Sequence, residues 1–298
     1  MKILLALVKR NIKLFFRDKG MFITSLITPI ILLVLYVSFL GNVYRDSFIQ
    51  NLPQGFPLEE AVLDGLVGGQ LISSILAVSC VTVSFCANFL MVQDKANGSL
   101  MDLLIAPVKP ATLALAYYLA TLCSSLAICL AATGLCLGYV ATMGFYMTLA
   151  DVLLLVLDVL LLVFFGTALS SVINFFLTTQ GQISAVGTII SSGYGFICGA
   201  YMPIASFGEG LQKVISLLPG TYGTALVRTH SLRGAVEELG KAGIPESALD
   251  EMRSALDCSI DFFGTTVPDG VMYLIWVGAV LLLMGVYVLL NILRKPQK

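Results

Sequence analysis

Long apolar stretches separated by shorter polar segments dominate this chain. Each stretch is about as long as the ~20 residues that a helix needs to cross ~30 Å of hydrocarbon. The stretches cover residues 21–40, 66–92, 112–139, 149–176, 182–202 and 271–293. Inside lipid a helix satisfies every backbone amide within its own segment. The pattern therefore predicts an all-α integral membrane protein with six transmembrane helices.

Composition supports this fold class and excludes others. Of 298 residues, 58% are hydrophobic and only 12% are charged, against roughly 25% charged residues in soluble domains. A soluble domain with so few charges would expose a surface that water solvates poorly. The net charge of −1 also argues against nucleic acid as a partner, because phosphate binding needs a concentrated basic surface.

Basic residues predict the orientation in the membrane. The short segments on one side carry Lys2, Lys9, Arg10, Lys13, Arg17, Lys19, Lys95, Lys109, Arg294, Lys295 and Lys298. The opposite short segments, 41–65 and 140–148, hold only Arg45. Lys and Arg in short loops mark the cytoplasmic side. We therefore expect a multi-pass protein of the cell membrane with both termini in the cytoplasm.

Residues 1–20 have the pattern of an amphipathic interfacial helix. At 100° per residue, Leu4, Val8, Ile12 and Phe15 fall on one stripe. The basic residues of this segment gather on roughly the opposite side. Such a helix lies in the membrane interface beside lipid headgroups. The simpler interpretation, a basic anchor for the first span, remains open.

The segment after the fifth stretch predicts two features on the extracellular side. Within 203–230, two apolar pieces too short to span are split by Pro219-Gly220. They indicate a re-entrant hairpin that enters the outer leaflet and returns. Residues 231–262 are more polar and acidic, with a plausible helix start at Pro245. They predict a soluble helical insert.

Two carboxylates in the fourth stretch are candidates for membrane-embedded chemistry. Asp151 and Asp158 share a helix face about 10 Å apart, with Asp151 expected at the hydrated membrane edge. A charge at the depth of Asp158 costs at least ~2.5 kcal/mol. It either faces a cavity as a cation or proton site, or bonds to Ser, Thr or Asn on a neighbouring helix. We favour the second, because no Lys or Arg lies at comparable depth. His230 is expected to be an ordinary interfacial residue.

Signatures of catalysis and metal binding are absent from the sequence. No G-x-x-x-x-G-K-[ST] loop exists to cradle ATP phosphates. The seven cysteines form no C-x-x-C pair, and His230 is the only histidine. We therefore predict no catalytic residue, no metal site and no enzyme activity. Any energy source must be another subunit or an ion gradient.

The segment 93–110 is the most informative loop. Asn97-Gly98 indicates a turn, and Ser99 followed by Asp102 fits a helix N-cap. The apolar side chains that share one face of the next two turns are Leu100, Leu103 and Leu104, and Pro107 and Pro110 close the helix. Such a helix fits a groove on a soluble partner, or rests on the membrane surface.

This loop resembles the signature of ABC-2-type permeases, the membrane subunits of one class of ABC exporters. The matching residues are Asp94, Gly98, Ser99, Leu100, Asp102, Leu103 and Pro107. The family often has a second acid where this chain has Ala96. Arg17-Asp18 and Pro29 are similar to the family's interfacial helix and first span. Its re-entrant segment is matched by Gly199, Pro203, Pro219, Tyr222 and Arg228.

The resemblance implies a type V ABC exporter-like fold, with the loop as a coupling helix beside an interfacial helix that includes Arg10, Arg17 and Asp18. Two permeases, identical or homologous, would enclose a pathway lined by stretches 66–92 and 182–202. Two separate ABC ATPase subunits would hold ATP and Mg, so this chain needs no cofactor. The low charge favours a lipophilic or amphipathic substrate such as a drug, peptide or lipid.

Two other functions remain open at the level of sequence. One is an ion-coupled carrier or channel that uses Asp158 and needs no partner. The other is a membrane scaffold or immunity factor that senses a ligand through the 231–262 insert. The pattern in loop 93–110 favours the exporter permease over both.

Overall fold

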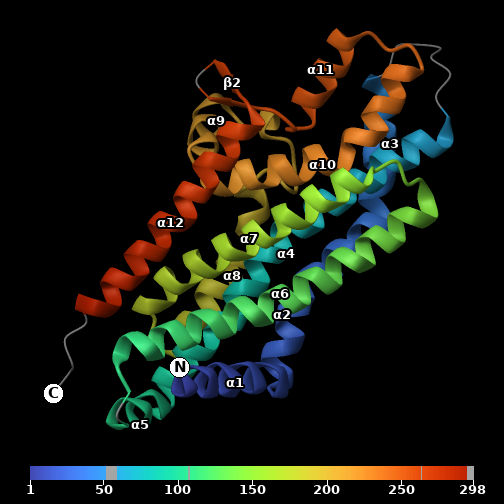
Figure 1. The fold of residues 1–298 in the computed structure, drawn as a ribbon. Coiled ribbons are helices and arrows are strands. Elements are labelled where there is room, and N and C mark those ends of the chain that lie inside the picture. The colour runs from blue at the N-terminus through green and yellow to red at the C-terminus, as the bar shows by residue number, and fades with distance from the viewer. Residues whose placement is uncertain (52–58, 107, 263, 294–298) are drawn as a thin grey trace.

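The structure, a computed structural model, describes residues 1–51, 59–106, 108–262 and 264–293 (Figure 1). Long helices tilted in the same direction form a bundle, and α1 lies across one end. The elements are α1 Lys2–Arg17, α2 Lys19–Leu35, the π-helical turn η1 Tyr36–Leu40, α3 Gly41–Asn51, α4 Glu60–Ala96, α5 Ser99–Ile105, α6 Pro110–Met143, α7 Leu149–Phe176, α8 Gln180–Ile197, the 3-10 turn η2 Ile204–Ser206, α9 Glu209–Ser216, α10 Pro219–Lys241, α11 Glu246–Ala255, β1 Ile260–Phe262, β2 Thr265–Val267 and α12 Asp269–Leu293.

Within these described ranges, five helical stretches are long and apolar enough to cross a membrane. They are Lys19–Ile49, Glu60–Ala96, Pro110–Met143, Leu149–Phe176 and Asp269–Leu293. The predicted fifth span forms α8, whose 18 residues extend about 27 Å at 1.5 Å per residue. α8 is less apolar than the five because it begins with two glutamines and carries hydroxyl side chains along its length. The multi-pass helical fold is confirmed, and α8 is the weakest of the six expected spans.

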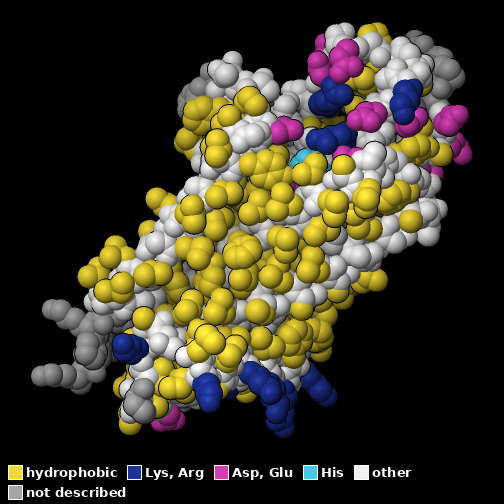
Figure 2. Space-filling view, viewed as in Figure 1, with side chains coloured by type: hydrophobic (Ala, Val, Ile, Leu, Met, Phe, Trp, Pro, Cys, Tyr) yellow, Lys and Arg dark blue, Asp and Glu magenta, His cyan; other side chains and the backbone are white. Residues whose placement is uncertain are grey.

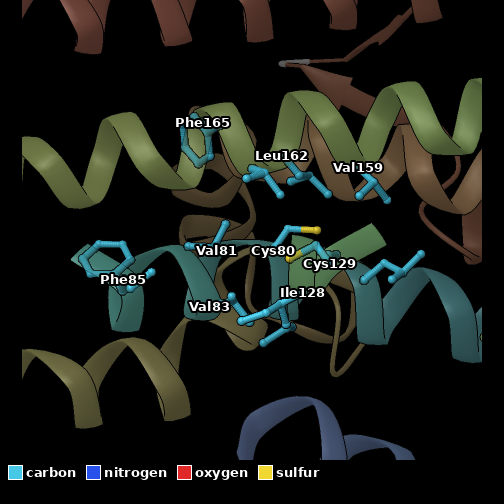
Figure 3. Close-up of a cluster of buried hydrophobic side chains, with 14 of the residues drawn as sticks. Cys80, Val81, Val83, Phe85, Ile128, Cys129, Val159, Leu162 and Phe165 are labelled. Atoms are coloured by element: carbon cyan, nitrogen blue, oxygen red, sulfur yellow. The ribbon is translucent and has the colours of Figure 1, made fainter. Parts of the chain in front are cut away.

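α4 is the central helix of the bundle. It packs against α2, α6, α7, α8 and α10, and its side chains from Leu66 to Val92 are buried. Figure 3 shows side chains of α4, α6 and α7 meeting around Cys80, Cys129 and Leu162. α7 approaches closely at Gly166, where a Cβ would lie 3.0 Å from Val81 Cα. This contact holds the two helices at a fixed spacing.

Charge separates the two ends of the molecule (Figure 2). Basic side chains gather at the end with α1 and α5, which we call the basic end. Acidic side chains gather at the opposite end with α9 to α11, among several basic ones, and we call this the acidic end. Between them the visible surface is a band of hydrophobic side chains with hardly any charge. This pattern fits a bundle whose middle is surrounded by lipid.

The acidic end differs from the sequence prediction in one boundary. α10 continues past residue 230 to Lys241, so the first part of the predicted 231–262 insert belongs to a buried helix. Leu232, Ala235, Val236 and Leu239 recur at helical spacing and pack against α3 and α4. The charged residues between them gave this segment a soluble appearance in the sequence.

The rest of the insert is small and only partly helical. α11 begins directly after Pro245, at the expected helix start. β1 and β2 then form an antiparallel pair in which Ile260 lies opposite Val267. The prediction of a purely helical insert is wrong at this hairpin. The hairpin leads directly into α12, so the insert is tied to the bundle at both of its ends.

Candidate functional site

The loop that carries the family resemblance forms α5 at the basic end. The helix N-cap is Gly98, with φ of 79°, and no side chain caps the helix. Glycine adopts this left-handed conformation without the penalty of a Cβ. The predicted capping role of Ser99 is therefore wrong, because Ser99 is already the first helical residue. α5 ends at Ile105, and Pro107 lies outside the described residues.

The apolar side chains of α5 face two ways. Leu100 is buried against the bundle and Leu103 packs partly against it, whereas Leu104 is exposed, so the predicted single apolar face of these three leucines is divided between the bundle and the outside. The face turned outward carries Met101, Leu104 and Ile105, the last of them 84% exposed. Asp102 is exposed on the same short helix. The reason is the left-handed turn at Gly98, which sets the rotation of α5 relative to α4.

Asp94 connects this loop to the interfacial helix. Its carboxylate accepts hydrogen bonds from Arg10 Nη1 at 2.8 Å and from Tyr117 Oη at 2.6 Å. We call Arg10, Asp94 and Tyr117 the basic-end cluster. Burial by itself lowers the pKa of Arg10, but the hydrogen bonds and charge of Asp94 raise it above its ordinary value. The cluster joins α1, α4 and α6 through one carboxylate.

Two further contacts fix the elements around this cluster. Lys95 Nζ donates to the carbonyls of Asn174, Phe175 and Leu177 at 2.8 to 3.0 Å. A cation placed there satisfies the free carbonyls at the C-terminus of α7. Asp18 caps α2, accepting from the Met21 amide at 3.1 Å. Arg17, the last residue of α1, is exposed.

α1 packs as an amphipathic helix, with its buried stripe rotated from the predicted one. Leu7, Asn11 and Phe15 are buried against the bundle, while Ile12 is only half-buried. The stripe includes the polar Asn11 because the contact surface is α6 rather than lipid. α1 is therefore part of the folded bundle, in addition to any contact with headgroups.

A cavity of about 980 Å³ opens between α2, α4 and α8. α4 contributes Cys86, Phe89 and Gln93 to its wall, and α8 contributes a row of hydroxyl and glycine residues. Gln93 directly precedes Asp94, so the cavity wall adjoins the basic-end cluster. Asp18 also lines the cavity. The two helices predicted to line a pathway, 66–92 and 182–202, both line this cavity, together with α2.

Asp158 is fully buried near the acidic end, with His230 and Tyr273 as polar partners that were not predicted. His230 Nδ1 lies 2.6 Å from Asp158 Oδ2, and Tyr273 Oη donates to Asp158 Oδ1 at 2.5 Å. We call Asp158, His230 and Tyr273 the acidic-end cluster. The predicted partner, a Ser, Thr or Asn, is wrong, and so is the interfacial position of His230. The cluster joins α7, α10 and α12.

Asp151 is also buried rather than hydrated. It forms a capping box with Thr148 at the start of α7, and Arg233 Nη1 lies 3.2 Å from its other oxygen. Both basic partners of the α7 acids thus come from α10. The sequence contained a signal for this: two acids in an apolar helix require nearby bases, and His230 and Arg233 stand three residues apart.

The predicted re-entrant segment forms α9 and α10, and Arg228 ties them to the insert. Arg228 is buried, and it donates to the carbonyls of Gly199 and Leu256 at 2.8 Å and to Asp257 at 3.2 Å. Burial raises the pKa of Asp257, an effect that the charge of Arg228 opposes. From sequence, Arg228 was expected in the hairpin without a partner.

The remaining residues of that segment have local roles. Pro219 is the first residue of α10, and Tyr222 Oη donates to the Ser216 carbonyl at the end of α9 at 2.7 Å. Pro203 directly precedes the short 3-10 turn η2. Pro219 and Tyr222 thus set the turn between α9 and α10, whereas Pro203 lies before α9.

Comparison with known families identifies the chain. Residues 3–230 match the ABC-2 type transporter family, from α1 through the middle of α10. A comparison with curated proteins finds no match. Membrane proteins of this family are permease components that normally pair with an ABC ATPase subunit. The basic-end cluster, α5 and the cavity all lie within the matched residues. This chain therefore belongs to the ABC-2 type transporter family, as a membrane permease subunit of an ABC transporter.

Proposed function

We propose that this permease is half of the membrane part of an ATP-driven exporter. The basic end faces the cytoplasm, and the exposed face of α5 contacts a separate ATPase. The observation that carries the proposal is the basic-end cluster, in which Asp94 joins the interfacial helix to the loop that bears α5. A force applied to α5 reaches α1, α4 and α6 through that carboxylate.

The route from the ATPase to the pathway is short. α4 runs without interruption from the cavity wall to the loop before α5. Gln93 faces the cavity and the next residue, Asp94, binds Arg10. A tilt of α4 that the ATPase causes through α5 therefore changes the shape of the cavity directly. α1 and α5 move together because they share this attachment.

The cavity supplies half of the pathway, and a second permease, identical or homologous, supplies the other half. Its walls are mainly apolar, with hydroxyl groups along α8. Many side chains of α2 and α8 are exposed, including Ile27, Ile31 and Ile189. Exposed apolar faces on both sides of a cavity suit contact with a partner permease and with lipid. The transported molecule is lipophilic or amphipathic.

Two copies of the ATPase bind ATP and Mg, and each contacts one permease through α5. Burying Met101, Leu104 and Ile105 in a groove follows the usual way in which an amphipathic helix binds a partner. Both chain termini then lie in the cytoplasm of a cell-membrane protein. The permease itself contributes no residue to ATP hydrolysis.

The ion-coupled alternative finds little support in the position of Asp158. That carboxylate is fully buried, has two hydrogen-bond partners, and is not among the residues that line the 980 Å³ cavity. An ion site requires access from at least one side of the membrane. The scaffold or immunity alternative differs from the permease in needing no ATPase, which the following experiment tests.

Native mass spectrometry of the chain, extracted gently from its own membrane, tests the proposal. We expect a complex of two permeases with two ATPase-sized subunits. Changing Met101 and Ile105 together to Asp removes the apolar contact, and the ATPase subunits should be lost. Phe262→Asp changes an exposed apolar residue at the acidic end and should leave the complex intact. A wild-type chain that never carries an ATPase would overturn the proposal.

A further inference from the structure

The residues that line the cavity between α2, α4 and α8 indicate which chemical class of ligand it can bind. Its volume of about 980 Å³ lies at the upper end of the 300–1,000 Å³ typical of small-molecule sites. One wall, from α2, is mainly aliphatic, with Ile27, Ile31 and Leu35, although Thr24 and Thr28 also lie on it. The opposite wall, from α8, carries hydroxyl groups. A ligand that fills the cavity therefore needs an apolar side and a polar side.

Of the six Ser and Thr hydroxyls among the described residues that line this cavity, four already use their protons within their own helices. Each donates to the carbonyl four residues before it: Thr24 to Gly20 at 2.7 Å, Ser184 to Gln180 at 3.2 Å, Thr188 to Ser184 at 2.9 Å and Ser192 to Thr188 at 2.6 Å. A hydroxyl that donates in this way still has oxygen lone pairs to offer. The polar wall thus presents acceptors and favours a ligand that carries donors.

The charge of the cavity lining also favours a ligand that carries donors, and a positively charged one. Of the described residues around the cavity, Asp18 alone is charged. One of its oxygens caps α2, which leaves the other as an acceptor. Arg17 and Lys19 flank it in sequence but do not line the cavity. An anionic ligand would therefore enter this space without a counter-charge from the described walls.

Aromatic side chains add a further attraction for positive charge. Phe89 of α4, Phe196 of α8 and Tyr201 after α8 all line the cavity. A cation over an aromatic face is attracted by the negative face of the ring, more strongly where water is excluded. Acceptor hydroxyls, one carboxylate and aromatic faces together are the chemistry that recognises an ammonium-type group.

We propose that this cavity binds amphipathic cations that carry N–H donors. This assignment rests on the proposed function, since it names the substrate class of the pathway. The charged nitrogen lies between Asp18 and the hydroxyls of α8, and the apolar part lies along the isoleucines of α2. Anionic lipids and phosphorylated sugars are excluded by the same lining.

Fluorescence anisotropy with three matched dyes tests the charge and the donors separately. The full chain in phosphatidylcholine nanodiscs is titrated with rhodamine 6G, a lipophilic cation with two N–H groups. The second dye is the tetraethyl rhodamine ester, which keeps the charge without N–H donors, and the third is the anionic fluorescein ethyl ester. Empty nanodiscs correct for partition into lipid. We expect rhodamine 6G to bind most tightly, the tetraethyl ester several-fold more weakly, and the anion not at all. Anion binding equal to that of rhodamine 6G would overturn the assignment.

Matched variants place the binding in the cavity. Thr188→Val removes one acceptor at constant shape and should weaken rhodamine 6G about three- to tenfold. Thr142→Val, on an exposed hydroxyl of α6 outside the cavity, should change nothing. Asp18→Asn keeps an oxygen to cap α2 and should weaken both cations by a similar factor. Unchanged affinity in Thr188→Val and Asp18→Asn would show binding elsewhere and refute the assignment.

A second readout separates this inference from the proposed function. Neither Thr188 nor Asp18 lies on α5, so both variants should retain the ATPase complex in native mass spectrometry. Wild-type protein that forms the complex but binds none of the cations would remain an exporter permease with a different substrate. Wild-type protein that binds the cation without any ATPase would instead refute the exporter while keeping the cation site.

Discussion

The two ends of this permease both use buried carboxylates to join helices, but they differ in exposure. At the basic end, the Arg10 side chain is 32% exposed beside Asp94 at 9%. At the acidic end, His230 and Asp158 are 3% and 0% exposed, and Arg228 and Asp257 are 2% and 8%. A third pair of that end, Arg233 with Asp151, is 35% and 2% exposed and resembles the basic-end pair. An ion pair with one partly exposed partner can exchange its contact for water and form again. Breaking a fully buried pair costs more free energy, because water does not reach the separated groups. We therefore expect the Arg10–Asp94 contact to break and re-form more readily than the Asp158–His230 and Arg228–Asp257 contacts.

The difference in exposure changes how much each ion pair contributes to the free energy of unfolding. An exposed ion pair typically contributes 0.2–1 kcal/mol, because water screens it and solvates each partner after it breaks. Removing one partner of a buried pair costs about 3–5 kcal/mol, because an uncompensated charge remains inside. Stability should therefore be far more sensitive to substitutions at the acidic end. Transport coupling should show the opposite sensitivity.

The largest effect is expected for Arg228→Met. This change leaves Asp257 buried without its cation and leaves the carbonyls of Gly199 and Leu256 without their donor. We expect a loss of about 3–5 kcal/mol in the free energy of unfolding, measured by denaturant unfolding in detergent. Arg253→Met, which removes an arginine with partly exposed acidic partners on α11, is the control and should cost under about 1 kcal/mol. Equal losses in the two variants would remove the contrast on which the comparison rests.

Asp158→Asn comes next. The amide keeps the shape but no longer provides a carboxylate for His230 and Tyr273, so hydrogen bonds to a charged group worth about 1.5–3 kcal/mol each are weakened. We expect a loss of about 2–3 kcal/mol, and a double-mutant cycle with His230→Gln should show strong coupling. Asp102→Asn, on an exposed residue of α5, should leave stability unchanged.

The same variant also distinguishes two functions. Folded Asp158→Asn protein should still transport substrate with its ATPase, because the carboxylate does not line the cavity. Transport lost while the fold and the ATPase complex persist would instead support the ion-coupled carrier.

The sequence predicted the basic end better than the acidic end, for a physical reason. Asp94, Gly98 and Leu100 form a local pattern within seven residues, and the short-range geometry of a turn and a helix follows from it. Even there, the rotation of α5 escaped prediction, because it depends on the left-handed turn at Gly98 and on which leucine the bundle buries.

At the acidic end the partners are distant in sequence. Asp158 meets His230 across 72 positions and Tyr273 across 115. No local pattern in α10 shows that its polar residues are buried, because burial results from packing on α4, α7 and α12. The need to balance buried charges was the one feature of the sequence that pointed to these partners. Two acids in one apolar helix need basic partners. The segment 228–233 carries three basic residues, Arg228, His230 and Arg233.

Arg10→Gln should have the smallest effect on stability and a large one on coupling. Gln can still donate a hydrogen bond to the buried Asp94 carboxylate, which also keeps its bond from Tyr117, so we expect a loss of only about 1–2 kcal/mol in the free energy of unfolding. The complex with the ATPase should still assemble, since α5 keeps its exposed face. Without the guanidinium, α1 no longer moves together with the loop 93–110 that carries α5. Substrate should therefore no longer stimulate ATP hydrolysis by the complex. Lys13→Gln removes the same charge from an exposed position on α1 and should keep the stimulation. Loss of stimulation in both variants would mean that the charge of α1 matters rather than its bond to Asp94, and the basic end would then be an anchor instead of a moving joint.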